Sequence, residues 1–265
     1  MPLRHRISIV TGATAGIGEE IARRFVHAGA QVVLNGRRRE KLDELIREFG
    51  SEDATGVAGD AADPATIARL FQAARGEFAQ GKRDADLVVI NAGRGLKGSV
   101  LDSDEAQWEE MYRTNVLGAA RLLRSAAQRM LADLEESKRR GEASESWLQR
   151  PHDIVVVGST VGRNLSPFSS MYGSTKFALH SFTEAARREL GPKGIRVSLI
   201  EPGFVESEFQ GVAGYDPAWF AQVKDRIGPV LKPADVAQLV MSIITLPAHV
   251  HLSDAMIRPT RQDYP

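Results

Sequence analysis

Residues 7–18 read Ile-Ser-Ile-Val-Thr-Gly-Ala-Thr-Ala-Gly-Ile-Gly, and this stretch decides the fold. A short apolar run ends in a turn that holds Gly12, Gly16 and Gly18, and apolar residues recur at helical spacing from Ile17 onward. A strand, a glycine-rich turn and an amphipathic helix in this order are typical of the first half of a βαβ unit. The stretch therefore predicts a parallel sheet that starts at residue 7.

The same alternation continues to the end of the chain. Apolar runs of strand length are followed by helical patterns, which implies right-handed crossovers, and runs rich in Val and Ile fit strands buried on both faces. No internal repeat or shift in composition marks a second domain. We therefore predict one α/β domain over residues 1–265, a doubly wound, mostly seven-stranded parallel sheet with helices on both faces. The predicted strands are Ile7–Val10, Gln31–Asn35, Thr55–Ala58, Leu87–Ile90, Ile154–Val157, Ile195–Ile200 and Ala255–Arg258.

The composition excludes several classes of protein. With 34 basic and 34 acidic residues the net charge is zero, which gives no electrostatic reason for nucleic acid or an anionic membrane surface as the main partner. The absence of cysteine excludes disulfides, thiolate metal sites and cysteine nucleophiles. No apolar run approaches the roughly 18 residues of a membrane span, and Ile7–Val10 is too short for the apolar part of a signal peptide. We expect a soluble, cytoplasmic protein.

Two further segments each allow two interpretations. Residues 134–153 are dense in charge, and we interpret them as an insertion that forms a solvated helix extension and a surface loop; the alternative is an interface segment anchored by Trp147. His249 and His251 resemble a metal-binding pair, but no third ligand is evident. We predict a surface or interface role for them, and no metal.

A second group of residues, far from the glycine turn, is suited to proton transfer. Tyr172 and Lys176 are four residues apart in a helical pattern, so their side chains lie on one helix face. A phenol has an ordinary pKa of about 10, which a nearby ammonium lowers. Ser159 follows an apolar strand and can donate to the same carbonyl oxygen. Each residue also has an ordinary alternative, because such a pair is common on helices and such a serine is often a turn residue.

The two groups together resemble a known family. Glycines between a strand and a helix let the backbone approach a pyrophosphate, although a glycine-rich loop alone is weak evidence. The spacing Gly12-x-x-x-Gly16-x-Gly18 after Thr11 resembles the TGxxxGxG motif of the short-chain dehydrogenase/reductase (SDR) family. Further motifs follow in the family's order over residues 11–207. The resemblance implies a Rossmann-type fold and hydride transfer between a nicotinamide cofactor and a carbonyl or alcohol, with Tyr172 as the general acid/base.

The resemblance also implies a set of site residues. Asp60 matches the acid beside the adenine, residues 91–93 the motif beside the adenosine ribose, and Ser207 the position of a threonine that bonds the carboxamide. The catalytic residues are Ser159, Tyr172, Lys176 and Asn115, where Asn115 is expected to hold a water that relays protons from Lys176. The cofactor-binding residues are Gly12, Thr14, Gly16, Ile17, Gly18, Arg37, Arg38, Asp60, Asn91, Ala92, Gly93, Tyr172, Lys176, Pro202, Gly203, Val205 and Ser207. One departure is the 44-residue step from Asn115 to Ser159, longer than the family usually has, which reflects the charged insertion.

The end of the second predicted strand bears on the choice of cofactor. An NAD site usually has an acid there, whereas this chain reads Asn-Gly-Arg-Arg-Arg at residues 35–39. Arg37 can fork onto a 2′-phosphate, while Arg39 fits the start of a solvated helix. A basic residue often found inside the glycine turn of NADP enzymes is missing, because Ala15 stands there. We predict a preference for NADP(H) over NAD(H).

The substrate is the least determined part of the prediction. In such folds the segment after the Pro-Gly turn is a substrate lid, here residues 204–232, and its aromatic residues predict an apolar pocket, although some are expected to pack the lid against the body. An apolar ketone, aldehyde or secondary alcohol is favoured. The alternatives are a 3-oxoacyl-thioester (acyl-carrier-protein) reductase and a non-catalytic NADP-binding sensor or scaffold; a sugar-nucleotide epimerase is disfavoured by the short C-terminal part. The lid aromatics are Phe204, Phe209, Tyr215, Trp219 and Phe220.

Two arginines and the oligomeric state complete the expectations. Arg94 and Arg163 flank the predicted cleft, and we interpret them as solvated loop residues rather than as contacts to an anionic substrate. The family resemblance implies a homotetramer or homodimer, assembled through the helices after Asn115 and from Tyr172.

Overall fold

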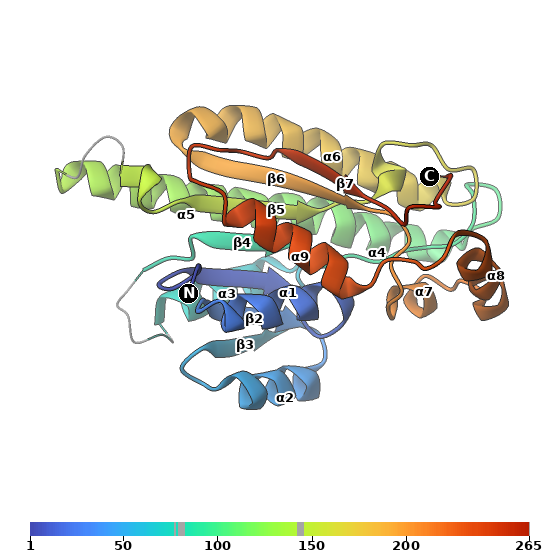
Figure 1. The fold of residues 1–265 in the computed structure, drawn as a ribbon, viewed down its shortest axis with the longest axis horizontal. Helices are drawn as coiled ribbons and strands as arrows, with labels where there is room; N and C mark the ends of the chain where they lie inside the picture. The colour runs from blue at the N-terminus through green and yellow to red at the C-terminus, as the bar shows by residue number, and fades with distance from the viewer. Residues whose placement is uncertain (77, 79–82, 142–145, 265) are drawn as a thin grey trace.

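The computed structural model describes residues 1–76, 78, 83–141 and 146–264 (Figure 1). Its centre is a seven-stranded parallel sheet in the order β3-β2-β1-β4-β5-β6-β7. All seven predicted strands are confirmed, with ends that differ by at most two residues. The strands are β1 Ile7–Thr11, β2 Gln31–Gly36, β3 Ala54–Ala58, β4 Leu87–Ile90, β5 His152–Val157, β6 Ile195–Pro202 and β7 Asp254–Ile257.

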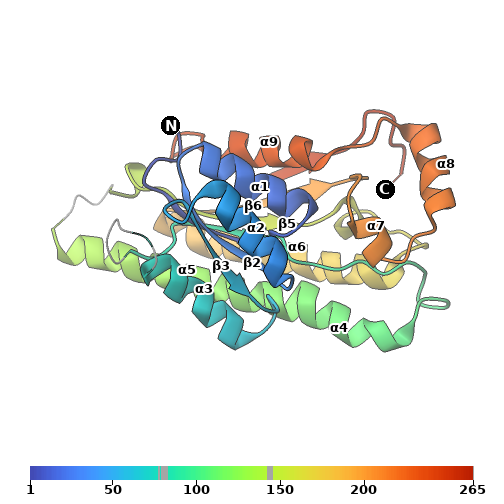
Figure 2. The ribbon, with the colours of Figure 1, turned by 90° about the horizontal axis from the view of Figure 1, so that it is seen from below.

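Helices cover both faces of the sheet, as the alternation of patterns predicts (Figure 2). One face carries α1 Gly16–His27, α2 Arg39–Phe49 and α9 Pro233–Ile244. The other carries α3 Pro64–Gly76, α5 Ala119–Arg139 and α6 Ser170–Leu190, with α4 Trp108–Tyr112 leading through a π-helical turn into α5. Two short helices, α7 Phe209–Val212 and α8 Pro217–Ile227, lie beyond the carboxyl ends of the strands (Figure 1). No helix of the described residues is both long and apolar enough to cross a membrane.

The core consists of two apolar layers, one on each face of the sheet. Ile9, Val88 and Ile154 point into the layer under α3, α5 and α6, whereas Val10 and Val89 point into the layer under α1 and α9. Every residue of β1, β2, β4, β5 and β6 is buried. Burial on both faces explains why these strands read as continuous apolar runs rather than as alternating ones.

The charged segment 134–153 begins as an extension of helix α5, but its last two residues, His152 and Asp153, are buried in β5, so the predicted solvated insertion extends two residues too far. Helix α5 continues to Arg139, residues 142–145 lie outside the described part of the chain, and β5 begins at His152. Trp147 packs against Gly194 of the same chain, where a Cβ would lie 2.9 Å from the indole Cγ. The described part of the segment is tied to the body by Asp133, which accepts hydrogen bonds from Arg150 (2.9 Å) and His152 (3.1 Å).

Candidate active site

A cavity of about 1480 Å³ opens at the carboxyl ends of the strands, where ligands bind in open α/β sheets. Its wall is formed by the β1–α1 turn, the ends of β2, β4, β5 and β6, the start of α6, and residues 203–226. Every site residue predicted from the sequence lines this cavity except Gly18 and Asn115, which lie directly behind the wall. The fold therefore brings together side chains that are separated by up to 195 positions in the sequence.

The glycine turn between β1 and α1 is shaped to leave its backbone accessible. Gly12 and Gly16 have φ of +65° and +56°, in the left-handed region that favours glycine. At Gly18 a Cβ would lie 2.3 Å from the carbonyl oxygen of Gly12, so only glycine allows this close approach. Helix α1 begins at Gly16, so its N-terminal N–H groups face the cavity. This is a suitable site for a pyrophosphate.

Thr11 joins this turn to the end of β4, a role that the motif alone does not reveal. Its hydroxyl donates to the carbonyl of Val89 (3.2 Å) and accepts from the backbone N–H groups of Asn91 and Ala92 (both 3.1 Å). The amide of Asn91 donates back to the carbonyl of Thr11 (2.9 Å). These bonds hold the predicted ribose-binding segment, which continues to Gly93, beside the glycine turn.

The end of β2 presents two arginines to the cavity. Arg38 donates to the carbonyl of Thr14 (2.8 Å) and pairs with Glu208 of the lid segment at 2.9 Å. The side chain of Arg37 is 73% exposed, and its only ion pair among the described residues is the one with Glu110, at 3.8 Å. Arg37 is therefore the more available of the two for an added anion.

Asp60, the residue predicted beside the adenine, lies at the same end of the cavity. It accepts from the backbone N–H of Ala62 (2.9 Å) and pairs with Arg113. Burial raises the pKa of this carboxyl, but the hydrogen bonds from Ala62 and Arg113 lower it more, so that the net pKa is below its usual value. Asp60 is consequently an acceptor at neutral pH.

Tyr172 and Lys176 lie on one face of α6 and enter the cavity together. Their exposed fractions are 8% and 7%, and the ammonium is 5.8 Å from the centre of the phenol ring. Lys176 donates to the carbonyl of Val157 (3.1 Å) at the end of β5. The ring of Phe209, from α7, lies 5.7 Å from that of Tyr172 and lines the same cavity.

Burial controls the charge of this pair. It raises the pKa of Tyr172 well above its ordinary value; the neighbouring Tyr215 adds to this and a hydrogen bond with Ser159 opposes it. Burial lowers the pKa of Lys176 to about 8. Desolvation therefore outweighs the lowering effect that a nearby ammonium has on the pKa of a phenol, and Tyr172 is a neutral phenol at pH 7.

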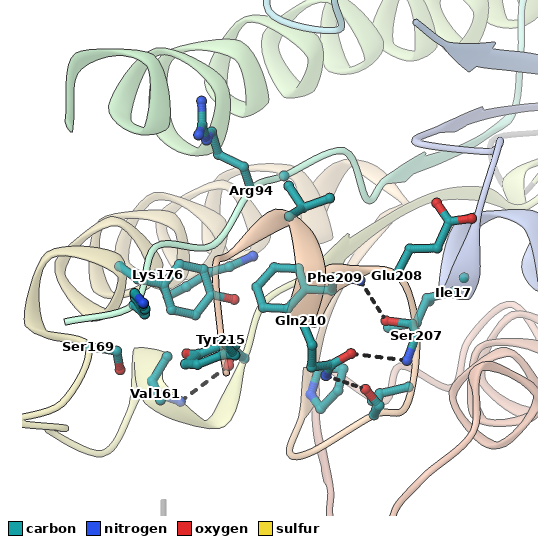
Figure 3. Close-up of a pocket in the computed structure, with 18 of the residues that line it drawn as sticks. Ile17, Arg94, Val161, Ser169, Lys176, Ser207, Glu208, Phe209, Gln210 and Tyr215 are labelled. Carbon is teal, nitrogen blue, oxygen red and sulfur yellow. Dashed lines mark hydrogen bonds between the residues drawn. The ribbon is translucent and has the colours of Figure 1, made fainter. Parts of the chain in front are cut away.

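Ser159 ends β5 and faces the same space. Its hydroxyl accepts from the backbone N–H of Val161 (3.4 Å), drawn in Figure 3, and it caps the 3₁₀ turn Thr160–Gly162. Ser159 is therefore both a turn residue and a lining residue of the cavity. Its role in the turn does not exclude a role as a hydrogen-bond donor to a substrate carbonyl.

Asn115 lies in the π-helical turn Arg113–Gly118, a type of turn that is frequent at functional sites. Its side-chain oxygen accepts from the backbone N–H of Arg94 (2.9 Å), and its amide donates to the carbonyl of Arg94 (2.8 Å) and to the hydroxyl of Thr175 (3.1 Å). The amide thus fixes the loop after β4 against α6. The water relay through Asn115 stays a prediction.

The segment after β6 forms the remaining wall. A Cβ at Gly203 would lie 2.2 Å from the Gln262 side chain, whose oxygen accepts from the backbone N–H of Phe204 (3.0 Å). Ser207 lies opposite Gly16, at 3.3 Å from where a Cβ of that glycine would stand. Its hydroxyl accepts from the N–H of Phe209 (3.3 Å), which Figure 3 shows. Gln262 and Tyr264 of the C-terminal segment also line this wall, which no motif in the sequence indicates.

The lid aromatics both line the cavity and pack, as expected. All five line it, and Tyr215 stacks on Trp219 with ring centres 5.2 Å apart. Phe220 is buried in a small apolar cluster with Phe204 beside it. The apolar wall extends to the rim of the cavity through Phe168 and Val212, which are 74% and 53% exposed. Neither residue is among the lid aromatics predicted from the sequence.

The interpretation of Arg94 as a solvated loop residue is wrong. Its side chain is only 17% exposed and pairs with Glu110 in α4 and with Gln107 just before that helix. Arg163 is half exposed but pairs with the fully buried Glu201.

The histidine pair near the C-terminus lies away from the cavity. His251 bonds the carbonyl of Val197 (3.0 Å), and His249 is exposed. Within the part of the chain that the structure describes, no group of three or more His, Cys, Asp and Glu residues is placed to hold a metal ion.

Comparison with known proteins agrees with this geometry. A family described as short chain dehydrogenase matches residues 6–216. An uncharacterised oxidoreductase of Staphylococcus aureus strain MW2 is 29% identical over 257 residues, which cover 97% of this chain and 98% of that protein. The closed form of serine dehydrogenase complexed with NADP+ is 32% identical with a TM-score of 0.80, covering 97% of this chain and 96% of the other. A 3-ketoacyl-(acyl-carrier-protein) reductase from Brucella melitensis, complexed with NADH, is 25% identical with a TM-score of 0.81, covering 98% and 99%.

Proposed function

Because the chain belongs to the short-chain dehydrogenase family, we propose that it is an NADP(H)-dependent oxidoreductase that interconverts a ketone or aldehyde and an alcohol. The observation that carries the proposal is the convergence of Ser159, Tyr172 and Lys176 on one cavity, beside a glycine turn that leaves its backbone open. A phenol, an ammonium and a hydroxyl around one point are suited to moving a proton at a carbonyl oxygen.

The residues at one end of the cavity fit a nicotinamide dinucleotide. The close approach at Gly18 and the left-handed Gly12 and Gly16 form a cradle that any side chain would fill, and a helix begins there. The ends of β2 and β4 would hold the adenosine half, and residues 202–207 the nicotinamide half. When bound, this group supplies or accepts the hydride; the protein supplies position and protons.

The chain's own residues account for the proton. In the reductive direction the hydroxyl of Ser159 holds the carbonyl oxygen, and the neutral phenol of Tyr172 donates its proton to that oxygen. The phenolate that remains is stabilised by the positive charge of Lys176. In turn, the phenolate favours the charged form of Lys176, which burial alone disfavours. Phe209 and the lid aromatics exclude water from the reacting atoms, which strengthens these interactions.

The substrate is proposed to be apolar around its carbonyl group. The wall next to Tyr172 is made of Phe209, Tyr215 and Trp219, and the apolar surface continues to Phe168 at the rim. Such a wall stabilises a hydrocarbon body by burial. A 3-oxoacyl thioester is the second candidate, because the exposed apolar rim suits an acyl chain and the Brucella reductase is similar in structure.

A panel of carbonyl compounds tests the function directly. Purified protein with NADPH is offered apolar cyclic and linear ketones, aldehydes and a 3-oxoacyl thioester, and the loss of NADPH absorbance is followed. We expect turnover with at least one apolar carbonyl. Tight NADPH binding without turnover across the panel contradicts the proposal and favours a sensor or scaffold. Turnover with the thioester alone favours the second candidate.

Arg37 is expected to determine the coenzyme preference. Arg37→Ala removes an exposed guanidinium from the cavity, and a charged hydrogen bond is worth about 1.5–3 kcal/mol. We expect the KM for NADPH to rise about 10- to 100-fold while the KM for NADH stays nearly constant. Arg39→Ala is the matched control, because Arg39 pairs with Asp43 along α2 outside the cavity. Equal kcat/KM with NADH and NADPH in the unmodified protein contradicts the preference.

A further inference from the structure

The ring of His180 lies between two glycines that flank Ser159. A Cβ at Gly158 would be 2.3 Å from its Nε2, and a Cβ at Gly162 would be 2.4 Å from its Cε1. Neither glycine has a left-handed φ, so the space taken by the ring, not the backbone conformation, requires glycine at both positions. The segment 158–162 is therefore wrapped around His180, which reaches it from the second turn of α6 beyond Tyr172.

A hydrogen bond joins the ring to the backbone of Ser159. The Ser159 N–H donates to Nε2 of His180 at 3.4 Å. An accepting Nε2 places the ring proton on Nδ1, which faces a carboxylate oxygen of Glu201 at 4.0 Å. Glu201 is fully buried and is held by two hydrogen bonds from Arg163, at 2.9 and 2.5 Å. Three elements, β5, α6 and β6, thus meet behind Ser159.

The charge state of the ring fits this role. Burial lowers the pKa of His180 to about 4, and the charges of Lys176 and Arg163 act in the same direction. The other charged groups around the ring are Glu201 on β6, at 4.0 Å from Nδ1, and Asp254 on β7 and Glu184 and Arg187 on α6, which line a shallow hollow with it. Near pH 7 the imidazole is neutral, so Nε2 keeps the lone pair that the Ser159 N–H requires.

We propose that His180 is a positioning residue that acts through Ser159: it fixes the backbone from which the serine hydroxyl reaches the substrate carbonyl. This rests on the proposed function of Ser159. A hydroxyl that orients a reacting oxygen must be held within a fraction of an ångström, and a free backbone N–H beside it allows the segment to shift. His180 itself does not line the main cavity, so it touches neither substrate nor cofactor.

The first experiment compares two replacements of the ring. His180→Phe keeps a planar ring between the glycines and removes the acceptor, whereas His180→Gln can place an oxygen near the position of Nε2. We expect kcat to fall about tenfold in H180F, with the dissociation constant for NADPH unchanged, and to recover to within about threefold of the unmodified value in H180Q. His251→Phe is the control, since it loses a hydrogen bond to Val197 away from the cavity and should keep kcat. An equal loss in H180F and H180Q indicates packing alone and overturns the proposal.

A double-mutant cycle with Ser159→Ala provides the decisive readout. If His180 acts through the serine hydroxyl, H180F lowers kcat in the parent and has little further effect in S159A. A purely structural role gives additive losses and overturns the proposal. If H180F does not fold, H180N replaces it in the same cycle. The side chain of Asn is one methylene shorter than that of Gln, so its amide does not reach the position of Nε2. Full activity of S159A itself contradicts the proposed function, whereas a normal H180F beside a defective S159A contradicts only the role of His180.

Discussion

Tyr172→Phe is expected to lower kcat for carbonyl reduction about 10²- to 10⁴-fold, the usual contribution of a positioned general acid. The change removes only the hydroxyl, so the ring keeps its contacts with Phe209 and the buried cluster of Leu96 and Met111. Burial already raises the pKa of this phenol, and phenylalanine is neutral as well, so the fold should lose little. Initial rates with NADPH and the best carbonyl of the panel measure the effect, and NADPH fluorescence titration measures binding.

Tyr112→Phe is the matched control for this change. Its hydroxyl is bonded to Ser174 at 2.6 Å, on the side of α4 away from the cavity, and its loss should leave kcat within about twofold. If kcat of Tyr172→Phe stays within a few-fold of that of the unmodified protein, the assignment of Tyr172 as the general acid is wrong. A large loss of NADPH affinity in the same variant assigns the defect to binding instead.

The strands and the glycine turn could be predicted from the sequence because local patterns encode them. Val88 and Val89 lie in a short apolar run that is buried on both faces. Such a run is typical of a central strand of a parallel sheet. The turn is encoded equally locally, since Gly12 and Gly16 are required by backbone angles within the same eight residues. The placement of Ser159 beside Tyr172 followed from the resemblance to the family, and the structure brings both to one cavity.

Contacts between residues far apart in sequence could not be predicted in this way. Arg94 pairs with Glu110 of α4 across 16 positions, a contact that no local pattern indicates, so a loop arginine that was expected to be solvated is partly buried. The high pKa of Tyr172 has the same origin, because desolvation depends on Phe209 and other residues brought in by the fold. The bond from the Ser159 N–H to His180 likewise joins two motifs that the sequence argument treats separately.

The largest feature of this kind is a row of buried charges at the amino ends of four neighbouring strands. Arg6 before β1, Asp86 before β4, Asp153 in β5 and Arg196 in β6 follow the order of the sheet. Arg6 bonds Asp86 at 2.5 Å and Asp153 at 2.9 Å, and Arg196 holds both oxygens of Asp153 at 2.7 and 3.1 Å. Burial lowers the pKa of Arg6, but the two carboxylates raise it more, so the guanidinium is charged at every accessible pH.

Arg196 extends this row to the last helix. Its remaining N–H groups donate to the carbonyl of Ile244, where α9 ends, and to those of Leu246, Pro247 and Val250 just beyond it. A cation at a helix C-terminus is favourable, and the guanidinium satisfies carbonyls that have no partner within the helix. Asp153 is thus the group that compensates two buried arginines and, through Arg196, orders the segment that leads to β7.

Asp153→Asn is therefore expected to lower the free energy of unfolding by about 3–5 kcal/mol, the cost of breaking a buried ion pair from one side. The replacement keeps the shape of the side chain, so no cavity forms, but it leaves the buried guanidinium of Arg196 facing a neutral amide and leaves Arg6 with Asp86 as its one carboxylate partner. Chemical denaturation followed by circular dichroism measures the change. Asp43→Asn is the control, since its pair with Arg39 is largely exposed and should contribute little. Equal stability losses in the two variants contradict the stabilising role of Asp153. The row of charges lies at the opposite end of the strands from Tyr172. The folded fraction of Asp153→Asn should therefore keep the KM of the unmodified protein for the carbonyl.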